Sequence, residues 1–512
     1  MDTMLVSVLV AVALLLVSWV LPKRKSTVAK YPDPPIIPFS SEEIIRNPHE
    51  CFMYGFRHYG QVFRYYGNGS VSCSSTLLAF LLIAIQYRYM VSKELTERVL
   101  TDDTTFSFEL GVAKALKINL VSCFHRGTFH SDVDAIVTEV TVKRLKSIIP
   151  KISPIFQRNA AELVQMHGNE PFDPLPYLQK TVAEAIAVII FGDEIARTCN
   201  PDLIVNIAEG VAKATGMFQN QSSWGRKFPT LYSFYSWTEL ILFHLIWRFG
   251  REMGPTVWTA LSKLSSSPRD SKDADDTNST VLAVLARKLA SKPGHLSIAS
   301  KIWAITLSLA FIFASVHQTV VIMTYVVFEL ARHPECQESI VLTDLSPSSP
   351  VTVDSLRDAI HAESFIREVL RMKGEAITTV RSPRHDLELA GYFIPKGSLL
   401  QPMVYPSNRS PEYTTNPDTF DGMRWTQNRK LATTTGPGHL SFGLGRWACP
   451  GRFLAVAEIK LVILTLLAQA DLELVDGEFT LADKLNIVGT PPRGRMVMKR
   501  RLRTGTSGGR VN

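Results

Sequence analysis

One cysteine of this chain stands in a setting that could do chemistry. The stretch FGLGRWACPGRFLA, residues 442–455, places Cys449 between Gly445 and Gly451 and directly before Pro450. Proline is favoured at the first position of a helix, and the residues behind it have helical periodicity, so the sequence predicts Cys449 at an N-cap. Free backbone N–H groups and the positive end of a helix dipole at that place would lower the pKa of the thiol.

The residues around this cysteine indicate a bulky, flat ligand. Gly445 and Gly451 remove side chains where the backbone would have to approach such a ligand, or allow a positive φ, and Phe442 offers an aromatic face. A thiolate with N–H donors, an aromatic neighbour and room for a plane is what a haem iron requires of a sulfur ligand. A buried structural cysteine is the alternative, and the loop alone does not decide between the two.

A pair of opposite charges precedes the cysteine loop. In REVLRM, Glu368 and Arg371 are spaced i, i+3 and share one face of a predicted helix. By itself such a pair is most often a solvated ion pair of little energetic value.

Together, the loop and the pair resemble the cytochrome P450 family, the haem-thiolate monooxygenases. The cysteine loop of that family reads Phe-x-x-Gly-x-Arg/His-x-Cys-x-Gly, which Phe442, Gly445, Cys449 and Gly451 match. The resemblance therefore implies haem b as the cofactor and Cys449 as the axial ligand of its iron. Trp447 stands where the family has an arginine or histidine that contacts a haem propionate, and its indole can donate one hydrogen bond but carries no charge.

The resemblance also implies a structural triad. Glu368 and Arg371 take the place of the family's helix pair, and Arg424, four residues after Phe420 in PDTFDGMRW, takes the place of its third partner. Two guanidinium groups around one carboxylate form a rigid hydrogen-bonded unit that can support the haem-side loop. The pair, the arginine and the cysteine loop follow one another in the family's order.

The long apolar stretch 297–334 is predicted to be a central buried helix, because polar residues interrupt it too often for a membrane span. In the family this helix crosses above the haem with the pattern Ala/Gly-Gly-x-Asp/Glu-Thr-Thr, which here reads ASVHQT. His317 replaces the acid and Gln318 the key threonine, while Thr319 comes one residue later, about 100° away on an α-helix.

Two interpretations of this helix stay open. In one, Gln318 orders a water molecule and His317 supplies protons near neutral pH, so that both act catalytically with Thr319 close by. In the other, they are satisfied polar residues of a core helix.

The N-terminus predicts a membrane anchor. Residues 4–21 are uncharged and just long enough to span hydrocarbon, and Lys23, Arg24 and Lys25 follow them. The positive-inside rule then places the body of the chain in the cytosol. A cleaved signal peptide fits poorly, since the basic residues lie behind the apolar run. With the family resemblance, this predicts a single-pass protein of the endoplasmic reticulum membrane.

The fold class expected from the resemblance is mainly α with small β-sheets (α+β), in one large domain of the cytochrome P450 fold. The predicted divisions are a transmembrane anchor at 1–22, a proline-rich linker at 23–40, the catalytic domain at 41–503 and a flexible tail at 504–512. Residues 70–86 do not fit the pattern and are predicted to be an insertion or a translated intron, because joining RYYGNG to YRYMV gives a strand–turn–strand. Residues 237–250, WTELILFHLIWRFG, are either a membrane-dipping element or a buried helix, and we favour the buried helix.

Composition excludes few functions. The six cysteines are scattered without close pairs, which suits a reducing compartment, and a net charge of +8 is too small to imply nucleic acid. The chain has no glycine-rich dinucleotide motif of its own, so electrons from NADPH would come from a flavoprotein NADPH–cytochrome reductase.

A basic face of Arg446, Arg452 and Lys460 could bind such an acidic partner protein, or these charges could simply be solvated.

The resemblance implies oxidation of C–H bonds with O₂ in a hydrophobic small-molecule substrate, beside membrane lipid. The forms FASVH and GRFLA are similar to filamentous-fungal members that act on terpenoids and indole-diterpenes in secondary metabolism. Two alternatives stay open: a haem-thiolate enzyme that rearranges or dehydrates its substrate without O₂, and an inactive haem-binding remnant.

Overall fold

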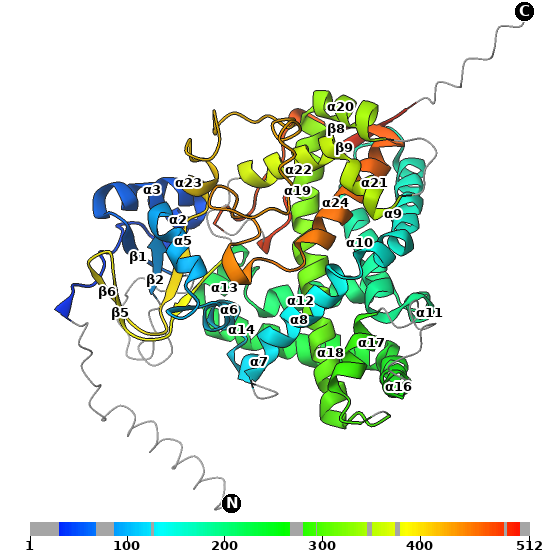
Figure 1. Ribbon diagram of the computed structural model, residues 1–512, viewed down its shortest axis with the longest axis horizontal. Helices are drawn as coiled ribbons and strands as arrows, with labels where there is room; N and C mark the ends of the chain where they lie inside the picture. Colours follow the sequence, from blue (N-terminus) through cyan, green and yellow to red (C-terminus); the bar gives the residue numbers. More distant parts are fainter. Residues whose placement is uncertain are drawn as a thin grey trace, which may run out of the picture.

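Helices fill most of the molecule, and short strands lie together toward one edge (Figure 1). The computed structural model describes residues 30–67, 87–123, 127–266, 280–292, 294–345, 351–373, 379–485 and 489–501. The predicted anchor at 1–22, the predicted insertion at 70–86 and the predicted tail at 504–512 lie outside the described residues. The predicted class, mainly α with small sheets, is confirmed.

The elements have the following bounds. The helices are α2 Ser41–Arg46, α3 Pro48–Tyr59, α5 Lys93–Thr101, α6 Phe108–Ala115, α7 Asn119–Cys123, α8 Phe129–Thr141, α9 Leu145–His167, α10 Leu175–Phe191, α11 Asp193–Ala196, α12 Pro201–Ala214, η3 Gln219–Gln221, α13 Ser223–Lys227, α14 Pro229–Thr238, η4 Glu239–Phe249, α15 Gly250–Glu252, α16 Gly254–Ser265, α17 Val281–Leu289, α18 Ile298–Ile312, η6 Phe313–Gln318, α19 Thr319–Arg332, α20 Pro334–Asp344, α21 Val353–Asp358, α22 Ile360–Met372, α23 Tyr405–Asn408, η7 Gly445–Trp447, α24 Arg452–Leu467 and η8 Val475–Gly477. The strands are β1 Val62–Tyr66, β2 Tyr87–Val91, β3 Phe106–Ser107, β4 Ser382–Pro383, β5 Leu387–Leu389, β6 Tyr392–Ile394, β7 Leu399–Pro402, β8 Ala470–Leu474 and β9 Met496–Arg500.

A long helix made of α18, η6 and α19 runs through the middle of the molecule (Figure 1). Ser297 caps its start by accepting a hydrogen bond from the backbone N–H of Ser300, and it ends at Arg332. Among the described helices it alone is long and apolar enough to cross a membrane, but half of its most apolar window is buried. Because it packs against α10, α12 and α24, the predicted central buried helix is confirmed.

Two paired strands flank the predicted insertion. β1 and β2 are antiparallel with Tyr66 opposite Tyr87, and β7 extends the sheet in parallel beside β2. The expected strand pair on either side of residues 70–86 is therefore present. A turn at residues 395–397 connects β6, which pairs with β5, to β7 in a different sheet.

Deleting residues 70–86 is expected to leave the fold intact. Gly67, Asn68 and Gly69 would then connect Tyr66 to Tyr87, and three-residue loops with glycine commonly close antiparallel pairs. We expect the shortened chain to unfold at the same temperature as the full chain or higher, as measured by circular dichroism. Loss of a cooperative transition would show that the segment is part of the folded protein, and sequencing the spliced transcript tests the intron explanation directly.

The predicted linker packs on the domain in its second half. The backbone N–H of Arg64 in β1 donates to the Pro35 carbonyl at 2.7 Å, and Ile37 donates to the Arg64 carbonyl at 3.0 Å. Ile37 is only 2% exposed. The stretch is extended as expected, but the folded domain begins before residue 41.

The prediction of a buried helix at residues 237–250 is wrong. This stretch forms the π-helix η4, and among its apolar side chains only Leu240 and Phe249 are buried, whereas Phe243, Ile246 and Trp247 are 51–63% exposed. Apolar residues lie on all sides of this helix, so packing of one side against the rest of the protein cannot bury all of them. With exposed side chains of α14, among them Phe234 and Tyr235, they form one exposed apolar surface, which we call the α14–η4 surface.

Candidate functional site

The cysteine loop, residues 440–451, is closed by its own backbone. The N–H of Cys449 donates to the Phe442 carbonyl at 2.8 Å, and the N–H of Ala448 donates to the Gly445 carbonyl at 3.1 Å. Gly445 has φ +75°, and a Cβ at this position would lie 3.1 Å from the Leu100 carbonyl oxygen. Glycine is therefore required there both by backbone conformation and by space.

Cys449 is not the N-cap of the following helix. α24 begins at Arg452, and Gly451 is its N-cap, so the predicted start at Pro450 is two residues too early. Many protein atoms surround the Cys449 thiol, yet the residue has solvent-accessible surface, as expected of a group that faces an internal space. A side chain at Gly451 would lie 3.9 Å from the Cys449 sulfur.

Burial raises the pKa of the free Cys449 thiol, and the N–H of Gly451 and the charge of Arg452 oppose this only in part. The predicted lowering of this pKa is therefore wrong for the protein alone, because desolvation outweighs the N–H groups at the helix start. A coordinated metal ion deprotonates such a thiol, so the raised pKa does not argue against a thiolate ligand.

Trp447 lies in a stack of rings and cations. Its indole stacks on Phe108 of α6 with the ring centroids 4.9 Å apart and 15° between the planes. The guanidinium of Arg446 lies 4.9 Å from the Trp447 ring and is paired with Asp134 of α8 at 2.7 Å. Where the family has a charged residue, this chain thus fixes the loop to α6 and α8 through Trp447 and its neighbour.

Glu368, Arg371 and Arg424 come together as predicted. The Glu368 carboxylate is fully buried and accepts from Arg371 Nε and Nη2 at 2.9 and 2.8 Å, and from Arg424 Nε at 3.0 Å. Trp425 Nε1 also donates to it at 3.0 Å. Both carboxylate oxygens are therefore used, in the geometry that makes charge-assisted hydrogen bonds strongest.

This triad is joined to the cysteine loop by two short connections. Arg371 Nη1 donates to the backbone carbonyl of Asn408, whose side-chain oxygen accepts from the backbone N–H of Leu440. The hydroxyl of Ser441 donates to the Leu370 carbonyl in α22 at 2.9 Å. Displacement of α22 would therefore be transmitted to the start of the loop.

On the central helix, His317 is buried in an aromatic contact. It stacks on Phe313 with the centroids 5.7 Å apart, meets Phe218 edge-on at 5.5 Å, and its Nε2 lies 3.3 Å from the Gly489 carbonyl oxygen. Burial lowers the pKa of His317 to about 4. Near neutral pH the imidazole is therefore neutral, which disagrees with the expectation that His317 supplies protons there as an imidazolium.

The helix is of the π type over residues 313–318, which sequence periodicity did not predict. In a π-helix the residues i and i+5 stack as i and i+4 do in an α-helix. Ala314 and Thr319 are five apart, so the extra residue offsets the one-residue displacement of the threonine. The expectation that Thr319 lies about 100° from the motif position assumed an α-helix throughout, and it stays a prediction.

Gln318 and Thr319 differ in their contacts. Gln318 is half-buried and its side-chain N–H lies 3.3 Å from the sulfur of Met217, a weak acceptor. Thr319 is buried, and within the described residues no hydrogen bond of its hydroxyl is found, whereas Thr324 donates to the Val320 carbonyl at 2.8 Å.

Arg381 is a candidate site residue that the sequence did not indicate. It is fully buried, its Nη2 donates to the Leu100 carbonyl at 3.1 Å, and its guanidinium lies 5.1 Å from the ring of Phe108. Burial lowers its pKa to about 10, and its Nε has no partner in the described part of the chain. A buried guanidinium that forms no ion pair with a carboxylate of the described residues points to an anionic ligand group. The only sequence signal is an arginine between Val380 and a short strand.

The comparisons with known proteins agree with this geometry. Residues 43–498 match the family model of cytochrome P450. The chain belongs to the cytochrome P450 family. The fold of retinoic acid-bound cyanobacterial CYP120A1 superposes with a TM-score of 0.61 at 19% identity, covering 92% of this chain and 100% of that one.

Curated relatives match over shorter segments. Cytochrome P450 monooxygenase gliF of Aspergillus fumigatus is 34% identical over 186 residues, 32% of this chain and 36% of the relative. Cytochrome P450 monooxygenase paxP of Penicillium paxilli is 29% identical over 227 residues, 43% of each chain. The matched segments thus span between a third and a half of these two relatives.

Haem, the cofactor of the cytochrome P450 family, fits the residues present. Cys449 is an exposed residue that offers its sulfur in a closed loop, and Gly451 places no side chain beside it. Arg381 offers an unpartnered buried N–H to a propionate, and Trp447 an indole N–H. When bound, haem supplies the redox and oxygen chemistry.

The predicted basic face for a reductase is smaller than expected. Lys460 is 3% exposed and pairs with Glu363, so it cannot contact a partner protein. The guanidinium of Arg452 donates to the carbonyls of Thr433 and Cys449. Only Arg446 of the three has a largely exposed side chain, and it already pairs with Asp134.

Proposed function

We propose that this cytochrome P450 is a membrane-anchored monooxygenase that oxidises C–H bonds of a hydrophobic, terpenoid-like secondary metabolite with O₂ and electrons from an NADPH–cytochrome reductase. The observation that carries the proposal is the exposed residue Cys449 in a loop that hydrogen bonds connect to the buried Glu368 triad. The similarity to gliF and paxP, both named as monooxygenases, supports the reaction class. The substrate class rests on the resemblance of the FASVH and GRFLA forms to fungal members.

The residues of this chain would divide the work as follows. Cys449 binds the iron, and Arg381 and Trp447 hold the haem carboxylates. Thr319 and Gln318 hold water beside the central helix, and the Thr319 hydroxyl can both accept and donate a proton. His317, neutral at pH 7, positions this segment through its contacts to Gly489 and Phe218 and does not supply protons.

The carbon-monoxide difference spectrum of the dithionite-reduced, membrane-expressed full chain tests the proposal first. A strongly red-shifted Soret band is expected if Cys449 binds the iron as thiolate. Absence of this band from folded, haem-loaded protein would overturn the proposal.

Thr319→Val is expected to divert electrons from product to hydrogen peroxide by about tenfold, and Gln318→Ala by less, because only the hydroxyl relays a proton. Thr324→Val is the matched control, since that hydroxyl is bonded to its own helix. The measurement is peroxide and product formed per NADPH consumed, with whichever substrate the enzyme accepts. Equal coupling in all three variants would exclude a relay at this helix.

The α14–η4 surface supports membrane lipid as a partner. Its side chains, among them Phe234, Phe243 and Trp247, are exposed apolar groups of a size that water rarely covers on a protein without a partner. Brominated lipids in vesicles should quench the fluorescence of the full chain, and Trp247→Phe should remove part of this quenching. Identical quenching in the variant would place the surface outside the membrane.

A haem-thiolate enzyme that acts without O₂ is the second candidate, favoured by one observation: Gln318 stands at the motif position of the threonine. Turnover without a reductase would support it, and strict dependence on NADPH and O₂ would exclude it.

A further inference from the structure

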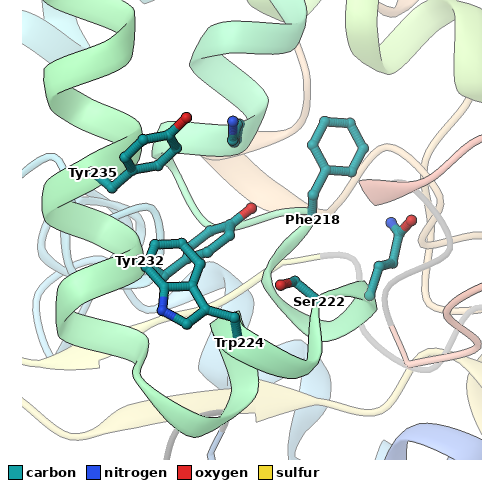
Figure 2. A pocket seen from close by; sticks show the side chains of 7 residues that line it. Phe218, Ser222, Trp224, Tyr232 and Tyr235 are labelled. Atoms are coloured by element: carbon teal, nitrogen blue, oxygen red, sulfur yellow. The ribbon is translucent and has the colours of Figure 1, made fainter.

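A cavity of about 660 Å³ that is open to solvent is lined by side chains from α12, η3, α13 and α14 and the residues that connect them. Figure 2 shows Trp224, Tyr232 and Tyr235 on one side of it, with Phe218 facing them from the other side and Ser222 between. Its volume is that of a site for one drug-sized molecule. Lys213 and Gln221 complete its lining.

The aromatic wall of this cavity is a corner and not a flat stack. The ring of Trp224 meets that of Tyr232 at 5.4 Å and 59°, and that of Tyr235 at 5.7 Å and 81°. Rings set at such angles offer a flat ligand a face on one side and an edge on the other, which are the two arrangements that aromatic pairs prefer. The wall therefore fits a flat ring system better than a flexible chain.

The charge of the cavity is balanced. Lys213, its only ionisable lining residue apart from the tyrosines, forms an ion pair with Glu239 at the start of η4. Its ammonium also lies 4.9 Å from the centroid of the Tyr235 ring. An anionic ligand would have to displace Glu239, and a cationic ligand would meet the ammonium of Lys213. The cavity therefore favours a neutral molecule.

Hydrogen-bond donors remain for such a molecule. The Ser222 oxygen accepts from the backbone N–H of Gly225 at 3.1 Å, which leaves its hydroxyl proton to donate. The floor is fixed, because Asn220 donates to Asp483 at 2.8 Å and Gln221 to Thr490 at 2.5 Å.

One side chain that lines the cavity, Phe218, also contacts the central helix formed by α18, η6 and α19. Phe218 lines the cavity and meets His317 of η6 edge-on at 5.5 Å, and the neighbouring Met217 contacts Gln318. On the outer side, Tyr235 belongs both to the cavity and to the exposed α14–η4 surface. A ligand in the cavity would thus lie between that surface and the central helix.

We propose that this cavity is a binding site for a neutral molecule with a flat aromatic ring system and a hydrogen-bond acceptor, occupied before the molecule reaches the central helix. This binding site rests on the proposed monooxygenase function. It extends that proposal, because the substrate would then carry a flat aromatic ring system. Phe218 is then the side chain that must move for the molecule to pass.

The test uses coumarin, a flat neutral aromatic with a carbonyl acceptor, and the haem-loaded full chain. Equilibrium dialysis counts all bound coumarin, while the shift of the Soret band reports only coumarin beside the haem. We expect dialysis to find a site that saturates without changing the Soret band. Trp224→Ala and Tyr235→Ala should weaken it at least tenfold, and Tyr235 is exposed enough for its replacement to leave the core undisturbed.

Matched controls are Trp247→Ala and Phe234→Ala, which remove more exposed aromatic groups of the α14–η4 surface outside the cavity and should leave this site unchanged. Coumarin-3-carboxylate should bind at least tenfold more weakly than coumarin. Equal binding in the Trp224 and Tyr235 variants and the wild type, or tighter binding of the carboxylate, would overturn the proposal. Failure of the monooxygenase proposal is distinguishable, because it removes the red-shifted carbon-monoxide band and not the coumarin site.

Discussion

Cys449→Ser is expected to abolish the red-shifted Soret band of the reduced, carbon monoxide-bound protein and all turnover that depends on NADPH. A serine hydroxyl keeps the shape of the side chain but is not a soft thiolate ligand for iron. The loop itself should persist, because the hydrogen bond from the backbone N–H of Cys449 to the Phe442 carbonyl is unchanged, and a serine oxygen can still accept from the backbone N–H groups of Gly451 and Arg452. Thermal unfolding of the protein without haem should therefore be unchanged.

Cys123→Ser is the control for this substitution. Cys123 is the other exposed free cysteine of the described residues, at the end of α7, and it should tolerate the change with full retention of the spectrum. A red-shifted band that survives in Cys449→Ser would mean that another group binds the iron, and the cysteine loop would lose its proposed role.

The parts of the site that the sequence predicted are those set by local patterns. The spacing of Glu368 and Arg371 places both on one helix face whatever the rest of the chain does, and their contact in the structure follows from it. The strands on either side of residues 70–86 were predictable for the same reason, since alternation and the aromatic residues Tyr66 and Tyr87 indicate an antiparallel pair.

The parts that the sequence did not predict depend on distant contacts. Lys460 looks like a surface lysine, and only the packing of α24 against α22 and α21 buries it beside Glu363. The π-helical turn at residues 313–318 has no signal in periodicity. The pKa of Cys449 was misjudged because desolvation by the folded chain outweighs a local dipole.

Glu368→Ala is expected to destabilise the protein by about 3–5 kcal/mol, because it leaves the buried guanidinium of Arg371 and that of Arg424 without a carboxylate. This is a large part of the roughly 5–15 kcal/mol that holds a typical domain folded. The free energy of unfolding is measured by urea denaturation. Haem loss should also accelerate, since Arg371 is joined to the cysteine loop through Asn408.

The relative losses of stability in single substitutions of the triad show whether its ion pairs, and not packing in general, stabilise the protein. Arg424→Ala should cost less than Arg371→Ala, because Arg424 is 15% exposed at its side chain and its loss leaves Glu368 paired with Arg371. Glu42→Ala, at an exposed i, i+4 pair with Arg46, should change stability by less than about 0.5 kcal/mol. If Glu368→Ala cost no more than Glu42→Ala, the carboxylate would not be what holds α22 to the cysteine loop. The loop would then owe its position to other contacts, such as the hydrogen bond from the Ser441 hydroxyl to the Leu370 carbonyl.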